Sequence, residues 1–283
     1  MKIISTRVDL KQYLLSILQA GKSVGFVPTM GALHKGHLSL MQKAVAENDY
    51  GIASIFVNPT QFGQNEDFSQ YPRTFEADCD LLKSAGIHAV FVPTTAEMYS
   101  PDEEIKIIFP SLTGILCDKF RPNHFEGVAR VVAKLLLLVK PTRSYFGQKD
   151  YQQGILIQKL VQELCIDTEV IICPIIRDLD GLALSSRNRY LSESERKQAL
   201  VLHQVLSQVR LAAQEGASLP LLNQLMETMF AQSDGYFQLQ YAEIRNGYTL
   251  SGLDRIEHSQ KPIALVAGYI GTTRLIDNMF LLE

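Results

Sequence analysis

The sequence has few cysteines, and they lie in no pattern that gives cysteine a chemical role. The 283 residues include only four, Cys79, Cys117, Cys165 and Cys173. None forms a C-x-x-C pair and no group of histidines lies beside them, so neither a disulfide framework nor a thiolate metal centre is expected. Scattered reduced thiols are typical of a cytosolic protein.

Long apolar runs are also lacking. The most apolar stretch after the N-terminal region, residues 131–139, contains Lys134 and is about half as long as the roughly 20 residues that a membrane-spanning helix needs. A buried helix is the better interpretation. The first 17 residues predict a short strand and an amphipathic helix rather than a secretory signal, because Arg7, Asp9 and Lys11 interrupt the apolar residues. We therefore expect a cytoplasmic protein that does not enter a membrane.

The sequence has no excess of positive charge. Its formal net charge is -3 at pH 7, so it offers no basic field for a phosphate polymer, and nucleic acid is not expected as a partner. Hydrophobic residues make up 46% of the chain, which is enough for a sizeable core. The length fits one large domain or two modest ones.

Strand-like and helix-like segments alternate through the first 176 residues. Strands are expected at residues 23–27, 52–57, 89–92, 144–146 and 169–173. Helices are expected between them at residues 37–47, 73–84, 127–139 and 149–164. Apolar strands separated by helices predict a Rossmann-like, doubly wound α/β domain with a parallel sheet, over residues 1–176.

The pattern changes after about residue 177. Two successive helices are expected at 192–215 and 219–232, followed by antiparallel strands at 237–245 and 263–270. This order predicts a smaller C-terminal α+β domain over residues 177–283. The polar segment Gln61–Tyr71 is weakly patterned, and we expect it to be a mobile loop over a site.

The segment PTMGALHKGH, residues 28–37, carries the strongest chemical signal. It follows the first strand of the alternating pattern and opens the next helix. A helix N-terminus offers N–H groups and the positive end of the helix dipole, which suit phosphate. Gly31 and Gly36 let a ligand approach the backbone closely. His34 and His37 lie one helical turn apart, so two imidazoles are placed to stabilise charge on an α-phosphate under attack.

The two histidines have other interpretations. A pair at i and i+3 can bind a metal ion, but no carboxylate lies nearby in the sequence to complete the site. Either histidine can also be an ordinary surface residue. The glycines, the strand–turn–helix context and the position at the start of the α/β sheet together favour nucleotide binding.

The H-x-G-H of this segment resembles the signature of the nucleotidyltransferase and class I aminoacyl-tRNA synthetase superfamily. The longer string PTMGALHKGHLSL is similar to one family within it, pantothenate synthetase (pantoate–β-alanine ligase). Six further segments resemble motifs of that family in the same order: NPTQFG at 58–63, YPRT at 71–74, RPNHFEGV at 121–128, FGQKDYQQ at 146–153, LSSRN at 184–188 and TRLIDN at 273–278. Gln148 stands where the family usually has Glu, and Asn123 where it usually has Gly.

The resemblance implies an activity. It is the ATP-dependent condensation of (R)-pantoate with β-alanine to give pantothenate, AMP and pyrophosphate through a pantoyl adenylate. Mg²⁺ would enter with ATP, no protein-bound metal is implied, and the implied assembly is a homodimer. The C-terminal domain would close over the ATP site, and the Gln61–Tyr71 loop is a second candidate for excluding water from the adenylate.

The resemblance also implies the site residues. His37 is the expected catalytic residue, and Gln61 and Gln153 are expected to bind the pantoate and β-alanine substrates. The expected ATP-binding residues are Met30, Gly31, Ala32, Leu33, His34, Lys35, Gly36, His37, Gly147, Gln148, Lys149, Asp150, Ile176, Leu184, Ser185, Ser186 and Arg187.

These residues also have plainer interpretations. Lys149 and Asp150 follow Gly147 at a strand end, a usual ligand position in open α/β sheets, but can equally be a surface ion pair that starts a helix. The hydroxyls and guanidinium of residues 185–187 suit phosphate oxygens, yet the two serines can be capping or turn residues. Gln61 and Gln153 can be ordinary surface residues. Asp78 can contact magnesium or be a solvated helix charge, and we assign it no role.

Three other functions are weighed against the ligase. An adenylyltransferase would attach AMP to a phosphate and stop there. A tRNA synthetase would normally be larger, with a K-M-S-K-S loop and a basic surface, whereas this chain has Ser-Ser-Arg and is acidic. A non-catalytic nucleotide sensor would not be expected to retain His34, His37, Lys149 and Arg187.

Overall fold

The computed structural model describes residues 1–64, 66–233 and 235–282. Asn65, in the predicted loop, and Asp234 and Glu283, in the predicted C-terminal domain, lie outside the described residues. The chain divides into two compact units. Unit 1 comprises Met1–Thr113, Arg121–Gly147 and Leu156–Pro174, and unit 2 comprises Gly114–Phe120, Gln148–Ile155 and Ile175–Glu283. The boundary expected between residues 176 and 177 stays a prediction.

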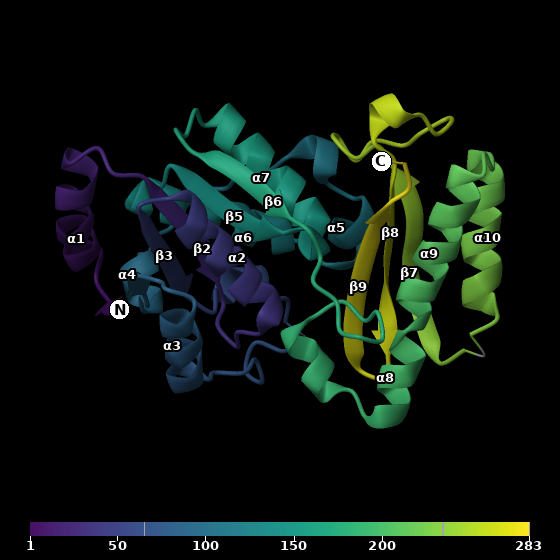
Figure 1. The fold of residues 1–283 in the computed structure, drawn as a ribbon, viewed down its shortest axis with the longest axis horizontal. Coiled ribbons are helices and arrows are strands. Elements are labelled where there is room, and N and C mark those ends of the chain that lie inside the picture. Colours follow the sequence, from purple (N-terminus) through teal and green to yellow (C-terminus); the bar gives the residue numbers. More distant parts are fainter. Residues whose placement is uncertain (65, 234, 283) are drawn as a thin grey trace. The chain divides into compact units, whose positions relative to one another are not determined.

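Unit 1 is built on a six-stranded sheet whose adjacent strands all pair in parallel. Its strands, in the order β1-β4-β3-β2-β5-β6 (Figure 1), are β1 (Lys2–Ile4), β4 (Ala89–Phe91), β3 (Tyr50–Ile55), β2 (Val24–Thr29), β5 (Arg143–Gly147) and β6 (Glu169–Cys173). The predicted parallel, doubly wound sheet is therefore confirmed. Strands buried on both faces need apolar residues at nearly every position, and β2 and β3 have them.

The helices of unit 1 connect these strands. They are α1 (Arg7–Gln19), α2 (Lys35–Glu47), α3 (Phe75–Ser84), α4 (Thr95–Met98), α6 (His124–Val139) and α7 (Tyr151–Glu163), with the short 3-10 helices η1 (Pro59–Gln61) and η2 (Pro110–Leu112). The first residues of α7 belong to unit 2. One face of the sheet packs against α2 and α3 through a buried cluster that includes Val27, Ala53, Val90, Met41 and Leu82.

The strand order creates a switch point in unit 1. The chain enters the middle of the sheet at β2, extends to β3 and β4 on one side, and returns to β5 and β6 on the other. Ligands of open α/β sheets bind outside the carboxyl ends of the strands at such a point. Here the two strands that flank it end at Thr29 and Gly147.

Unit 2 contains a three-stranded antiparallel sheet in the order β7-β8-β9 and helices that pack on it (Figure 1). The strands are β7 (Phe237–Arg245), β8 (Ile263–Ile270) and β9 (Thr273–Phe280); the helices are α5 (Leu116–Phe120), α8 (Glu193–Ala199), α9 (Val201–Gln214) and α10 (Leu219–Ala231). Its core joins apolar residues of α9 and α10 to the sheet, including Leu202, Leu206, Leu222, Val266 and Leu275. The predicted small α+β architecture is confirmed.

Unit 2 differs from the sequence-based prediction in several details, one of which is that the short helix α5 was not expected. The single helix expected at 192–215 is two helices, α8 and α9, which meet at Leu200 where the chain makes a tighter turn through a Leu200 N–H to Lys197 carbonyl bond. The strand β9 was not predicted. Among the described residues, no helix is both long and apolar enough to cross a membrane.

Candidate active site

The turn after β2 has a backbone conformation with positive φ angles, which few residue types adopt readily. Gly31 has φ +79°, and Ala32 follows with φ 50°. The Thr29 hydroxyl donates to the Ser54 carbonyl at 2.7 Å and accepts from the Gly31 N–H at 3.1 Å. A Cβ at position 31 would lie 3.0 Å from the Asp78 carboxylate. The turn therefore needs glycine for its conformation and for its close packing.

Asp78 on α3 stabilises this turn by hydrogen bonds to its backbone. Its carboxylate is 2% exposed and accepts from the N–H groups of Ala32 at 3.0 Å and Leu33 at 2.8 Å. The Thr74 hydroxyl donates to it at 3.2 Å. The interpretation as a solvated helix charge is therefore wrong. Sequence reasoning missed the role because the partners lie more than 40 positions away.

We expect Asp78→Asn to loosen the turn. One carboxylate oxygen becomes an NH₂ group facing a backbone N–H, so a charged hydrogen bond worth about 1.5–3 kcal/mol is lost. The free energy of unfolding should fall by about that amount, and the adenylation rate should fall about tenfold or more because His34 and His37 follow the turn directly. Asp80→Asn is the matched control, since Asp80 is an exposed neighbour on α3 whose carboxylate pairs with Lys83 at 3.1 Å. Equal melting temperatures and rates for the two variants would contradict this role of Asp78.

His34 and His37 lie at the N-terminus of α2, where each ring is oriented by the backbone. The Nδ1 of His34 accepts from the Gly36 N–H at 3.1 Å, and the Nδ1 of His37 accepts from the His34 N–H at 3.3 Å. Because Nδ1 accepts in both rings, a neutral ring carries its proton on Nε2. The ring centroids are 4.1 Å apart. The helix N-terminus thus combines its own positive dipole end with two imidazole N–H donors.

Gln61 lies in η1 with its side-chain amide oriented by Asn58. The Asn58 amide donates to Gln61 Oε1 at 3.0 Å and to the Gly127 carbonyl at 3.2 Å. The other end of the Gln61 amide, Nε2, contacts Met30 Sδ at 3.3 Å. The structure therefore brings together Met30 and Gln61, and it directs the Gln61 N–H groups rather than its oxygen toward Met30. An acceptor such as a hydroxyl or carboxylate oxygen suits this donor.

Asn58 and Tyr99 are further residues of this site that sequence reasoning did not assign. Asn58 is 1% exposed, and its Oδ1 accepts from the Tyr99 hydroxyl at 2.8 Å. Burial raises the pKa of Tyr99, which keeps this hydroxyl protonated as a donor. The chain Tyr99–Asn58–Gln61 fixes which amide atom of Gln61 is the donor. The only sequence signal was the position of Asn58 in the NPTQFG segment.

The segment after Gln61 is tied to the start of α6. His124 Nδ1 donates to the Gln61 carbonyl at 2.8 Å, and Arg121 makes a paired contact to Glu66 at 2.7 and 2.5 Å. Burial alone raises the pKa of Glu66, but the hydrogen bonds and charge of Arg121 outweigh burial and hold that pKa below its usual value. The mobility expected for this loop stays a prediction.

We expect Gln61→Ala and Gln153→Ala to weaken pantoate binding far more than ATP binding. Each variant would lose the predicted hydrogen bond to pantoate, and a bond to a charged group such as its carboxylate is worth about 1.5–3 kcal/mol, or ten- to a hundredfold in affinity. Pantoate and ATP dissociation constants measured by calorimetry would separate the two effects. Gln158→Ala, an exposed change on the same helix as Gln153, is the control. Equal weakening of ATP and pantoate would mean that both glutamines are misassigned.

In unit 2, the predicted residues 148–150 form a 3-10 helix, η3 (Gln148–Asp150), before α7. Lys149 and Asp150 form a loose ion pair at 3.8 Å, with side chains 21% and 50% exposed. Gln153 is partly exposed in the first turn of α7. The structure thus contains the ion pair of the plainer interpretation, and at 3.8 Å such a pair contributes little to stability.

The predicted residues from 176 to 187 form a hairpin and a cap. Ile176 and Leu184 are joined by a Leu184 N–H to Ile176 carbonyl bond of 3.0 Å. Ser185 then caps η4 (Ser186–Tyr190), its hydroxyl accepting from the Arg187 N–H at 3.3 Å. The capping interpretation of Ser185 is therefore also confirmed. A hydroxyl in a cap still has lone pairs and a proton for a ligand.

Taken together, the predicted residues form two groups. In unit 1, Met30 to His37 and Gln61 surround the turn after β2, and Gly147 ends the neighbouring strand β5. In unit 2, Gln148–Asp150 and Gln153 are contiguous, and Ile176 to Arg187 form the hairpin and cap. Among the described residues, no group of three or more His, Cys, Asp or Glu side chains is placed to hold a metal ion.

A parallel sheet with a glycine turn and a helix N-terminus at its switch point is typical of nucleotide-binding α/β proteins. Comparison with known proteins defines the class further. Residues 2–280 match the family model described as pantoate–β-alanine ligase. The pantothenate synthetase of Caldicellulosiruptor saccharolyticus is 44% identical over 96% of this chain and 96% of its own length.

Solved structures agree. Pantothenate synthetase from Thermus thermophilus has a TM-score of 0.94 and 41% identity, covering 100% of both chains. Pantoate–β-alanine ligase from Francisella tularensis, complexed with beta-gamma ATP and beta-alanine, has a TM-score of 0.82 and 35% identity, covering 99% of this chain and 98% of its own. The chain belongs to the pantoate–β-alanine ligase family.

Proposed function

We propose that this chain condenses (R)-pantoate with β-alanine and consumes ATP, giving pantothenate, AMP and pyrophosphate. The observation that carries the proposal is the end-to-end match to pantoate–β-alanine ligases, one of which was solved with beta-gamma ATP and beta-alanine. The two imidazole donors at the N-terminus of α2 support it, because adenylation needs donors beside an α-phosphate.

The first step is adenylation. The pantoate carboxylate attacks the α-phosphate of Mg-ATP, a new P–O bond forms, and pyrophosphate leaves with the electrons of the broken P–O bond. In this proposal His34 and His37 donate to phosphate oxygens, while Lys149 and the Ser185–Arg187 segment bind the phosphates as cation and hydroxyl donors. Magnesium enters as part of the nucleotide substrate. The protein contributes position and charge stabilisation rather than a covalent intermediate.

The second step is acyl transfer. The neutral amine of β-alanine attacks the activated carbonyl and a C–N bond forms. The bond from the carbonyl carbon to the bridging oxygen breaks, AMP leaves with that oxygen and the electron pair, and the nitrogen gives up one proton to solvent. The proposed role of Gln61 and Gln153 is to hold pantoate through both steps by its hydroxyl and carboxylate oxygens. Asp150 is proposed to accept from ribose hydroxyls, and the backbone of residues 30–36 and 147–148 to line the nucleotide. The adenylate must be kept from water, because it hydrolyses otherwise.

We also propose a cytoplasmic location and a homodimeric assembly. Both are supported by the family resemblance, and light scattering coupled to size exclusion would test the assembly. A single mass near the 31.7 kDa of the chain would contradict the dimer.

Exchange of labelled pyrophosphate into ATP tests the proposed function. The ligase should catalyse the exchange only when pantoate is present, and AMP should accumulate only when β-alanine is added as well. An adenylyltransferase would show exchange without producing AMP. A nucleotide sensor would bind ATP but show no exchange under any condition, and either outcome would contradict the proposal.

A further inference from the structure

The TRLIDN segment on β9 ends in two buried polar residues that the proposed mechanism does not use. Asp277 is 4% exposed and Asn278 is 2% exposed. Neighbouring residues of a strand point to opposite faces of its sheet. The pair therefore has two different sets of partners, and both sets lie within unit 2.

The side-chain amide of Asn278 makes all its hydrogen bonds described here to one short segment, η3. Its Nδ2 donates to the Gln148 carbonyl at 2.9 Å and to the Lys149 carbonyl at 3.0 Å. Its Oδ1 accepts from Gln148 Nε2 at 3.1 Å. All three bonds hold η3, which lies 128 or more positions earlier in the chain.

These bonds have a geometric consequence for Lys149. The carbonyls of Gln148 and Lys149 belong to the two peptide groups that flank the Lys149 Cα. One amide nitrogen that binds both oxygens fixes both peptide planes and, with them, the direction of the Lys149 Cα–Cβ bond. A buried, fully satisfied amide defines one geometry, because every alternative leaves the buried Asn278 amide without a partner.

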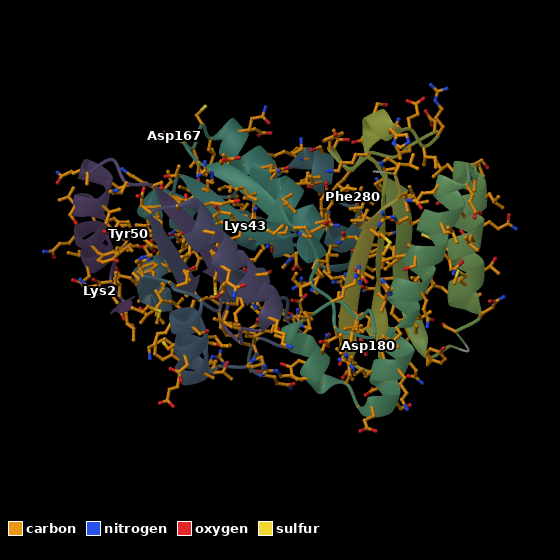
Figure 2. The ribbon with its side chains drawn as sticks, in the orientation of Figure 1. Lys2, Lys43, Tyr50, Asp167, Asp180 and Phe280 are labelled. Carbon is orange, nitrogen blue, oxygen red and sulfur yellow. The ribbon has the colours of Figure 1, made fainter. Side chains whose placement is uncertain are left out.

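Asn278 is itself held in place. Its N–H donates to Asp277 Oδ1 at 2.7 Å, and Asp277 makes a paired contact with Arg177 at 2.6 and 2.9 Å. Arg177 also donates to the Gly181 carbonyl at 3.1 Å, in the hairpin whose tip carries Asp180, labelled in Figure 2. Asp277 and Arg177 thus fix the backbone from which the Asn278 side chain extends.

The next turn of the chain is anchored to the same strand. The ring of Tyr151, the first residue of α7, contacts the ring of Phe280 on β9 (labelled in Figure 2), with centroids 5.4 Å apart. The Tyr151 hydroxyl donates to the Gly247 carbonyl at 2.6 Å, and burial raises the pKa of Tyr151 to about 12, so the hydroxyl remains a donor at neutral pH. The polypeptide on the C-terminal side of Lys149 is therefore fixed as well.

We propose that Asn278 is a positioning residue for Lys149. It acts on the reaction only through the backbone of residues 148–149, by aiming the ammonium group at the nucleotide phosphates. The proposal rests on the role given to Lys149 in the proposed function. A residue that packs the fold would affect every step equally, whereas a residue that aims Lys149 affects the adenylation step alone.

The test is a double-mutant cycle between Asn278→Ala and Lys149→Ala, read by single-turnover pyrophosphate release with saturating ATP and pantoate. Asn278→Ala should slow release about a hundredfold, the scale expected when a reacting group is displaced by about 1 Å. In the Lys149→Ala background the same change should slow release less than about threefold, because coupled residues are not additive. Pantoate affinity should stay at the parent value when Asn278→Ala is made in either background.

Two further variants test whether the effect is specific to the Asn278 amide. Gln240→Ala removes another side-chain bond of the same sheet, to Arg274 at 2.7 Å, without touching η3, and it should release pyrophosphate at the parent rate. Asn278→Asp keeps the side-chain shape but turns an oxygen toward the two carbonyls, so it should be at least as slow as Asn278→Ala. Circular dichroism and melting curves select the variants that are folded at the assay temperature.

If Asn278→Ala is not folded, Gln148→Ala, which removes only the Gln148 Nε2 to Asn278 Oδ1 bond, takes its place in the double-mutant cycle. Its expected loss is about tenfold and should disappear in the Lys149→Ala background; a loss that is equal in both backgrounds would mean a contact of Gln148 with ATP and would overturn the positioning proposal.

The outcomes separate this proposal from the proposed function. An effect of Asn278→Ala that is equal in both backgrounds means a structural role only and overturns the positioning proposal alone. A parent rate for folded Asn278→Ala also overturns it. A parent rate for Lys149→Ala would remove Lys149 from the proposed mechanism, whatever Asn278 does.

Discussion

His37→Ala should lower the rate of adenylate formation by about a hundred- to a thousandfold, which corresponds to about 2.7–4 kcal/mol for one well-placed donor to a developing oxyanion. The expectation follows from the orientation of the ring. Its Nδ1 accepts the His34 N–H at 3.3 Å, so the proton of the neutral ring lies on Nε2. The direction of this Nε2–H is therefore set by the backbone.

The effect should fall on the rate more than on ATP binding. Negative charge on the phosphate oxygens grows while pyrophosphate departs, and a hydrogen bond to them strengthens in the transition state. Removing the ring should therefore reduce the single-turnover rate strongly and the ATP affinity only slightly. His37→Gln should restore part of the loss if hydrogen bonding is sufficient, and none if a proton must be transferred.

Single-turnover pyrophosphate release with saturating ATP and pantoate is the measurement. His258→Ala, an exposed histidine of η5 (His258–Gln260), is the control for loss of an imidazole. Melting curves should show that His37→Ala is folded, although its loss removes an acceptor for the His34 N–H. A folded His37→Ala enzyme with the parent rate would show that this histidine is only structural.

The parallel sheet could be predicted because its information is local. Strands such as β2 and β3 are short apolar runs closed by Pro, Gly or Asn, and the helices between them have apolar residues at helical spacing. The turn with Gly31 and the two histidines could be predicted for the same reason. Its glycine, its helix start and its chemistry all lie within ten residues.

What could not be predicted depends on distant partners. Asp78 and Asn58 are polar residues that the sequence places on a helix and a loop, where exposure is the usual outcome, yet both are buried by partners that lie far along the chain. The strand β9 was missed because Asp277 and Asn278 interrupt its apolar pattern. They are tolerated inside because Arg177 and the backbone of Gln148 and Lys149 satisfy them, and these contacts span 100 positions or more.

Lys149→Ala should reduce the adenylation rate by about two to three orders of magnitude, on the scale of one charged donor at the reacting phosphates. The Lys149 side chain is 21% exposed, and its ammonium group forms a long ion pair with Asp150 at 3.8 Å. Such a pair contributes little to stability. The fold should therefore tolerate the change, and the melting temperature should stay close to that of the parent.

The rates of different substitutions at position 149 identify which property of Lys149 the reaction needs. If the charge alone matters, Lys149→Arg should retain part of the rate, because the guanidinium remains cationic, whereas Lys149→Met, which keeps the length of the side chain without the charge, should be as slow as Lys149→Ala. Lys197→Ala, an exposed lysine of α8 in the same unit, controls for the loss of one positive charge from the surface. The measurement is the rate of pyrophosphate release at saturating ATP, together with the ATP dissociation constant. Two results would exclude Lys149 from the phosphate site. One is a well-folded Lys149→Ala enzyme that turns over ATP at nearly the parent rate, and the other is a Lys149→Met enzyme with the full rate. In both variants the positive charge is gone.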